Sequence, residues 1–311
     1  MVEAIETREL ITVNVGGSCL RGTCHLTPDH RSGSAIGQNE GKRTGVLFVN
    51  SGYAPRSGSG DAAVYWADSF AKSGYPSFRL DLPGLGDSDG DLPEKWLELS
   101  DLINGGHYSS FVSDAAKSLT ESFHLSGVVI VGHCAGAISA IYAATSSKHI
   151  KGIVALDPYF FQNDEERTAI RQEMSHWVAR HKLAAQFGRI FGRLKQAKML
   201  LQKNKLPGNT NLRLIRCWKR LASAGLPMLV LNARSASQDQ DFDYFQYLQE
   251  SSGSGSRIVV QFIEGANHSF ADDVGRPAVQ RLAERWLKSC FPLVIQDEHA
   301  FSGQLTANHQ R

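Results

Sequence analysis

Residues 127–136 read Gly-Val-Val-Ile-Val-Gly-His-Cys-Ala-Gly, so four β-branched side chains run directly into a cysteine flanked by glycines. A run suited to a helix, Ala137 to Ala144, follows at once. A strand, a sharp turn and a helix, with Cys134 at the centre of a G-x-C-x-G pattern, are typical of a nucleophile elbow. Such a turn strains its central residue and needs small neighbours, which Gly132 and Gly136 provide.

The elbow predicts a chemical role for Cys134. At the N-terminus of a helix, the dipole and the free N–H groups favour the thiolate form of a cysteine. The alternative is a buried structural thiol on a degenerate elbow, because free cysteines are among the most buried residues. The strand–turn–helix context favours the nucleophile.

Length and composition bound the class of protein. The chain has 311 residues, 42% hydrophobic and 21% charged, which suffices for one large α/β domain with an insertion or for two domains. Met1 to Leu10 is polar and does not resemble a signal peptide, and no apolar run is long enough for a transmembrane helix. The five cysteines lack the spacing of a zinc site, so we expect no metal and no cofactor. Their odd number fits free thiols in a reducing cytoplasm.

The alternation of elements predicts a doubly wound, mostly parallel sheet with helices on both faces, opened by an antiparallel edge hairpin. Residues 91–106 are predicted to be irregular. The expected domains are a core of residues 1–158 and 226–295, a helical cap insertion of residues 159–225, and a tail of residues 296–311. The predicted strands are 9–15, 19–26, 46–49, 75–80, 127–131, 150–156, 227–232 and 258–263, and the helices are 62–72, 108–123, 137–144, 241–250 and 277–290.

His268 is the candidate general base. It lies in the sequence Gly-Ala-Asn-His-Ser-Phe directly after the last predicted strand, at the carboxyl edge where ligands bind in open α/β sheets. His133, next to Cys134, is expected to be structural, with its side chain directed away from the site and into the fold.

The residue that orients the base has two candidate positions. Asp157 ends the strand after the elbow, where a buried carboxylate can accept a hydrogen bond from His268 Nδ1. The usual loop after the penultimate strand has Asp239 and Asp241, which also suit a helix start. We favour Asp157 and keep the other loop, or the absence of an acid, as alternatives.

Two further turns bear on the chemistry. An oxyanion hole would take one N–H from Ala135 and a second from the loop after residue 49, where Ser51 and Gly52 are the candidates. The turn of residues 81–88, Asp-Leu-Pro-Gly-Leu-Gly-Asp-Ser, lacks the ending of a phosphate-binding loop and is interpreted as structural.

Taken together, the turn at residues 81–88, the Gly-His-Cys-Ala-Gly elbow and the His268 loop resemble the α/β-hydrolase superfamily over residues 9–290. The order nucleophile, acid, histidine is that of this fold. More narrowly, the chain resembles hydrolases associated with exosortase A gene clusters, through residues 45–53, 74–81, the elbow and residues 152–158. Its elbow is also similar to that of dienelactone hydrolases.

The resemblance includes a departure. Relatives often carry Asp near the position of Ser235 and Asn where this chain has Asp157, so the two appear exchanged here. Haloalkane-dehalogenase-like members of the fold place their carboxylate after the sixth strand, which supports Asp157. The cysteine itself replaces the usual serine and favours thioesters, lactones and activated esters over amides.

Charge is concentrated in the predicted cap. The chain has a formal net charge of +2, yet residues 159–225 carry 14 Lys or Arg against four acids. A solvated helix face is one interpretation, a docking surface for an acyl carrier protein or a coenzyme A thioester is the second, and binding to a membrane surface is the third. Neither nucleic acid nor stable membrane insertion is expected. The sequence thus predicts a cytoplasmic thioesterase- or esterase-type enzyme, with an acyltransferase or cyclase and a non-catalytic binding module as alternatives.

Overall fold

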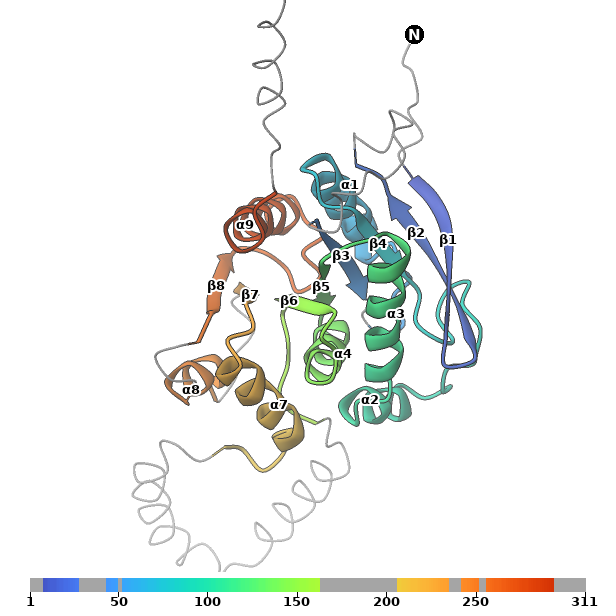
Figure 1. Cartoon of the computed structure of the whole chain (residues 1–311). Coiled ribbons are helices and arrows are strands. Elements are labelled where there is room, and N and C mark those ends of the chain that lie inside the picture. The colour runs from blue at the N-terminus through green and yellow to red at the C-terminus, as the bar shows by residue number, and fades with distance from the viewer. Residues whose placement is uncertain are drawn as a thin grey trace, which may run out of the picture.

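The computed structural model describes residues 8–27, 43–49, 52–162, 206–234, 242–251 and 256–293. An eight-stranded sheet in the order β1-β2-β4-β3-β5-β6-β7-β8 forms the centre (Figure 1). Its strands are β1 Arg8–Val15, β2 Ser18–His25, β3 Thr44–Val49, β4 Ser77–Leu80, β5 Gly127–His133, β6 Ile150–Leu156, β7 Met228–Arg234 and β8 Ile258–Glu264.

The direction of the strands confirms the predicted fold class. β1 and β2 form an antiparallel hairpin, and β2 pairs antiparallel with β4. From β4 to β8 every pairing is parallel. β3 is buried along its whole length and β6 at every residue except Lys151, as expected for strands covered on both faces. The carboxyl ends of the parallel strands therefore meet at one edge of the sheet.

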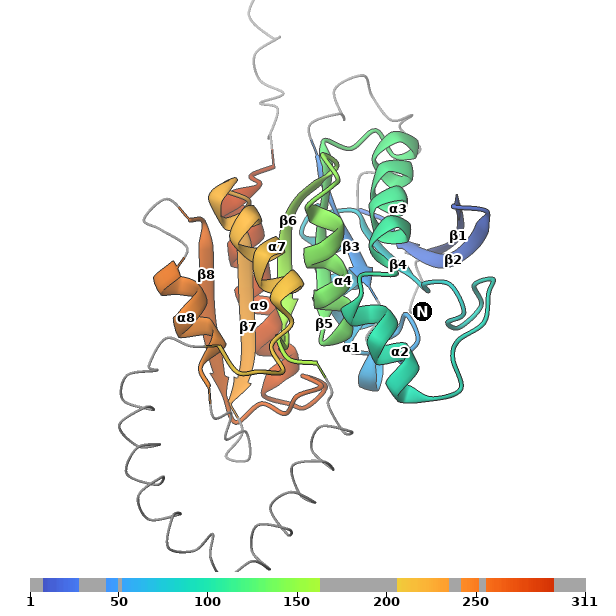
Figure 2. The same ribbon diagram turned by 90° about the horizontal axis from the view of Figure 1, so that it is seen from below.

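Helices cover both faces of the sheet (Figure 2). One hydrophobic core is closed by two helices, α1 Ala62–Lys72, which the 3-10 turn η3 Ser59–Asp61 precedes, and α9 Gly275–Cys290. The other core is closed by α2 Trp96–Asn104, α3 Ser109–Ser122, α4 Ala135–Ala144, α7 Leu212–Ser223 and α8 Tyr244–Ser251.

Helix α2 lies in the stretch that the sequence predicted to be irregular, so that prediction was wrong. Leu99 and Ile103, four residues apart, are the two hydrophobic side chains of this helix that are buried in the second core. The helix is short and isolated between loops, so its stability comes from this packing and not from a long periodic pattern.

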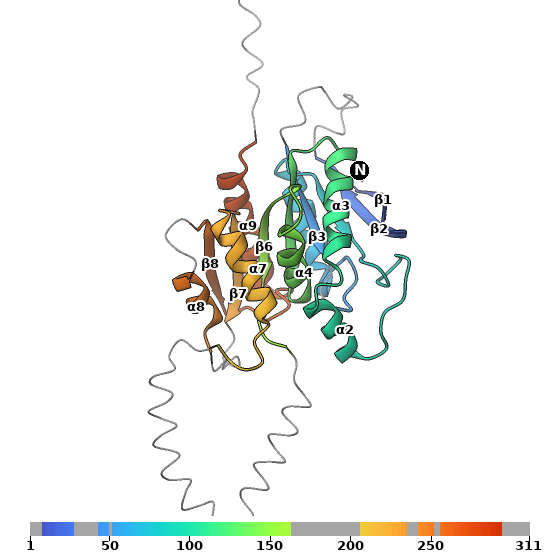
Figure 3. The ribbon, with the colours of Figure 1, turned by 60° about the horizontal axis from the view of Figure 1, so that its bottom comes forward.

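Helix α7 is the described part of the segment predicted to form a cap. It packs against α4, and Leu214 and Trp218 are buried in the core (Figure 3). Residues 163–205 lie outside the described residues, so the cap itself stays a prediction.

The turn between β5 and α4 depends on a glycine. A methyl group added at Gly132 would lie 2.5 Å from the carbonyl carbon and oxygen of Gly136 and 2.6 Å from the backbone nitrogen of Ala137. Backbone atoms cannot move aside as a flexible side chain can, so the close approach of strand and helix requires glycine here.

We therefore predict that Gly132→Ala lowers the free energy of unfolding by about 2–3 kcal/mol, because the added methyl group forces strand and helix apart. Gly225→Ala is the control, since a methyl group there meets nothing within 4 Å and only the positive φ of 68° is disfavoured. That variant should lose about 1 kcal/mol. Urea unfolding measures both, and equal losses would contradict the steric account.

Candidate active site

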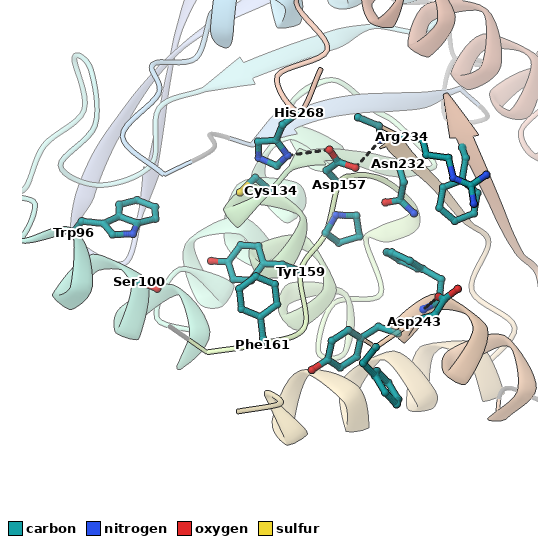
Figure 4. Close-up of a pocket in the computed structure, with 16 residues that line it drawn as sticks. Trp96, Ser100, Cys134, Asp157, Tyr159, Phe161, Asn232, Arg234, Asp243 and His268 are labelled. Carbon is teal, nitrogen blue, oxygen red and sulfur yellow. Dashed lines mark hydrogen bonds and ion pairs between the residues drawn. The ribbon is translucent and has the colours of Figure 1, made fainter. Parts of the chain in front are cut away.

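Cys134 occupies the strained position of the turn. Its backbone has φ 52° and ψ −113°, a conformation that costs about 1–3 kcal/mol for a residue other than glycine. Three backbone hydrogen bonds hold it there: its N–H donates to the Leu156 carbonyl at 2.8 Å, and its own carbonyl accepts from the N–H groups of Ala137 at 3.1 Å and Ile138 at 3.4 Å. The half-buried sulfur therefore lies at the carboxyl edge of the sheet (Figure 4).

Asp157 follows β6 at the same edge and is 8% exposed. Its N–H donates to the Leu231 carbonyl at 2.9 Å, which extends the pairing of β6 with β7 by one residue. One carboxylate oxygen, Oδ1, accepts the Ala233 N–H at 2.8 Å. The other, Oδ2, accepts a hydrogen bond from His268, so both oxygens are held in place.

His268 connects the carboxylate to the sulfur. Its Nδ1–H donates to Asp157 Oδ2 at 2.9 Å, and the ring lies beside Cys134 in the same cleft (Figure 4). The Asp157 hydrogen bond is the main reason that the pKa of His268 is raised to about 10; the neighbouring Cys134 thiol raises it further, and burial opposes the rise. The structure thus brings the three residues proposed from the sequence into one row.

The loop that carries His268 is fixed from three sides. His133 Nε2–H donates to the His268 carbonyl at 2.7 Å, and burial lowers the pKa of His133 to about 4, so its ring is neutral. Phe270 is fully buried, and Asp272 Oδ2 accepts the Asn267 N–H at 2.8 Å. His133 was predicted to be structural and directed into the fold; its ring does not line the cleft at Cys134 but lies with Phe48 and Trp66 on the α1 side of the sheet, where it supports the His268 loop.

A cleft of about 520 Å³ opens above these residues. In Figure 4, Trp96 and Ser100 lie on one side of Cys134, and Asn232, Arg234 and Asp243 lie on the other. Most of the remaining wall is aromatic. Besides the five residues just named and Cys134, Asp157 and His268, the described residues that line the cleft are Pro158, Tyr159, Phe161, Ala233, Phe242, Tyr244, Phe245 and Phe262.

Sequence reasoning did not identify the walls of this cleft. Trp96 and Ser100 are four residues apart on α2 and therefore face one side, but the segment was predicted to be irregular. The part of the wall that β7 forms could have been found from the sequence of this strand, because polar Asn232 follows four apolar residues of a buried strand.

The predicted oxyanion hole is described only in part. Ala135 is the first residue of α4, and the first N–H groups of a helix have no partner within the helix. Ser51 lies outside the described residues, whereas Gly52, the other candidate, is described and has φ 53°. The loop that follows is anchored by Asp81 at the end of β4, whose Oδ1 accepts the Arg56 N–H at 2.7 Å.

The alternative acids Asp239 and Asp241 lie outside the described residues. The neighbouring Asp243 is exposed, and its Oδ1 accepts the N–H groups of Phe245 and Gln246 at the start of α8. Within the described ranges, no group of three or more His, Cys, Asp or Glu side chains could hold a metal ion. No helix in that part of the chain is long and apolar enough to cross a membrane.

Comparison with known proteins agrees with this arrangement. The family model of the alpha/beta hydrolase fold matches residues 46–283, so the chain belongs to the α/β-hydrolase fold family. Comparison with curated protein sequences found no match.

Solved structures with the same fold include three of known origin. An esterase from Pyrococcus furiosus has a TM-score of 0.58 and 14% identity, covering 91% of each chain. A dienelactone hydrolase from Anabaena variabilis has a TM-score of 0.51 and 16% identity, and the match covers 91% of this chain and 97% of the hydrolase. The protein Est1E from Butyrivibrio proteoclasticus, with ferulic acid bound, has a TM-score of 0.54 and 13% identity. The match covers 90% of this chain and 98% of Est1E.

The hydrogen bond with Asp157 generates a prediction about titration. Asp157→Asn removes the main cause of the raised pKa of His268, so the imidazole should lose its proton at a markedly lower pH than in the parent, closer to its ordinary value of about 6.5. Imidazole NMR over a pH series, assigned with His268→Gln, measures this.

Asp239→Asn and Asp241→Asn are the matched controls, because they are the other candidate acids. Both variants should leave the His268 titration near pH 10. A large fall in either control, with no fall in Asp157→Asn, would move the orienting carboxylate to the other loop.

Proposed function

We propose that this protein is a Cys-dependent hydrolase that cleaves esters, thioesters or lactones through an acyl-enzyme, with Cys134 as nucleophile, His268 as acid and base, and Asp157 as the orienting acid. The observation that carries the proposal is the row itself. The imidazole of His268 hydrogen bonds with Asp157 and lies beside Cys134, a cysteine on a strained strand-to-helix turn, in the same cleft (Figure 4). Geometry of this kind defines an activated nucleophile.

The first half of the reaction forms the acyl-enzyme. The Cys134 sulfur attacks the carbonyl carbon while its thiol proton resides on His268, and the carbonyl π electrons move to the oxygen. The Ala135 N–H and a second N–H from the loop after β3 would stabilise this oxyanion. The tetrahedral intermediate then collapses, the bond to the leaving oxygen or sulfur breaks, and His268 gives its proton to the leaving group.

The second half releases the acid. His268, neutral after the first half, takes a proton from water as the water oxygen attacks the thioester carbon. The bond between carbon and Cys134 sulfur breaks, the thiolate departs, and it is again paired with the protonated imidazole. Asp157 keeps the Nδ1–H of His268 in place throughout, so that Nε2 faces the sulfur.

The cleft favours apolar acyl or alcohol groups, because aromatic side chains supply most of its wall. Its fold neighbours include an esterase and a dienelactone hydrolase, which supports ester chemistry as the first to test. The narrower similarity to exosortase-associated hydrolases rests on the sequence motifs, and we retain it as part of the proposal.

Acyl transfer is the second candidate, because an aromatic wall limits the access of water to an acyl-enzyme. The acyl group would then pass to an amine or alcohol. An acyl carrier protein or coenzyme A thioester would suit the 14 Lys and Arg of residues 159–225 as donor. Product analysis with and without an added amine separates transfer from hydrolysis.

We predict that Cys134→Ala lowers kcat/KM for nitrophenyl esters and acyl thioesters by at least about 10³-fold, because the covalent route is lost. Cys134→Ser should retain little, since the site is arranged for a thiol. Cys217→Ala is the control, because Cys217 lies on α7 outside the cleft and should keep the parent rate. Equal rates for Cys134→Ala and the parent would remove the nucleophile assignment and leave a binding module.

A further inference from the structure

Asn232 breaks the apolar pattern of β7 at the point where the strand reaches the cleft. Leu229, Leu231 and Ala233 face the core beneath α1 and α9. Met228 and Val230 face the opposite core, and Asn232 is the next residue on their side. A polar amide therefore replaces the apolar side chain that this face of the strand otherwise carries.

The amide nitrogen of Asn232 is buried and unpaired. The residue is only 5% exposed, and its Nδ2 has no hydrogen-bond partner in the part of the chain that the structure describes. Buried amides without a partner are rare, because they lose their hydration and gain nothing in return. Figure 4 shows Asn232 beside Asp157, with the amide directed into the cleft.

Asn232 is not a further member of the catalytic row. Both oxygens of Asp157 already accept hydrogen bonds, from Ala233 and from His268. Asn232 Nδ2 therefore has no partner in the described part of the chain, although the residue lines the cleft.

The surroundings of Asn232 favour a neutral partner. Phe262 lies opposite it in the pairing of β7 with β8, and the Arg234 guanidinium lies over that ring at 5.1 Å. Arg234 also forms an ion pair with Glu264 at 3.1 Å. Asp243 on the same side accepts two backbone N–H groups, so each described charge in this wall has a protein partner.

We propose that Asn232 is a specificity-determining residue, which donates a hydrogen bond from Nδ2 to a neutral oxygen on an otherwise apolar substrate. The oxygen would be a ketone, ether or second ester oxygen on the part of the substrate that lies over β7 and β8, beside the scissile bond at Cys134. The inference rests on the proposed function, because it names the substrate class of that same site: oxygenated, uncharged acyl esters or thioesters.

The test compares octanoyl esters with oxo-octanoyl esters whose ketone is moved along the chain one carbon at a time. The readout is the ratio of kcat/KM for each oxo ester to that of the plain ester. For at least one ketone position the parent should prefer the oxo ester by about tenfold or more, since an unpaired polar group in the site penalises a substrate that cannot pair it. Asn232→Leu, which has a similar shape and no donor, should bring this ratio to about 1.

Gln246→Leu is the matched control, because it removes an amide from the exposed face of α8, and its ratio should equal that of the parent. Asn232→Asp keeps the shape but replaces the donor by an acceptor, so it should lose the preference for the ketone even if Asn232→Leu folds poorly. The inference is overturned if the parent shows no preference at any position, or if both Asn232 variants keep it.

A failure of the proposed function can be told apart from a failure of the Asn232 inference. If the parent hydrolyses none of the esters, the chemistry is wrong, and Asn232 is then tested by binding alone. Calorimetry with unreactive methyl ketones, with and without a second ketone oxygen, should show tighter binding of the diketone to the parent than to Asn232→Leu. Equal binding of both ligands to the parent would overturn the inference independently of turnover.

Discussion

The hydrogen bond between His268 Nδ1 and Asp157 Oδ2 is the contact on which the site depends. It joins the loop after β8 to the end of β6, two segments 111 residues apart in the chain. It fixes the tautomer and the direction of His268, whose side chain is 50% exposed, because the hydrogen bond at one ring nitrogen decides which nitrogen carries the proton. The same bond is the largest cause of the raised pKa of His268.

Both partners of that bond are held by ordinary features of the fold. Asp157 is fixed by two hydrogen bonds with β7: its N–H donates to the Leu231 carbonyl, and its carboxylate accepts the Ala233 N–H. The pairing of two parallel strands therefore positions the carboxylate. His268 is fixed because Phe270 is buried in the core beneath α1 and α9, and because neutral His133 donates to its carbonyl. Cys134 is held by the close approach of β5 and α4 at Gly132. The backbone strain at Cys134 is thus maintained by the packing of the strand and helix around it.

The parts of the fold that local patterns encode were predictable. Helix α1 begins and ends at the predicted residues, and the elbow follows from a β-branched run and two glycines. The edge where Cys134, Asp157 and His268 meet follows from the rule that parallel strands end together. The choice of Asp157 over Asp239 was not fixed by pattern, because it depends on which carboxylate the loop after β8 can reach.

The walls of the cleft were not predictable by the same reasoning. Trp96 and Ser100 face the site only because α2 forms, and α2 is stabilised by tertiary packing of Leu99 and Ile103. Arg234 lies over Phe262 because of the register between β7 and β8, which no local pattern specifies.

Trapping the acyl-enzyme tests the central claim most directly. The protein is mixed with an activated acyl thioester, quenched in acid within the first turnover, and examined by intact mass and peptide mapping. The account predicts one acyl group, on Cys134, which disappears as turnover is completed and is absent from Cys134→Ala. Turnover of the same thioester with no adduct at any time, or with an adduct on another residue, would contradict it.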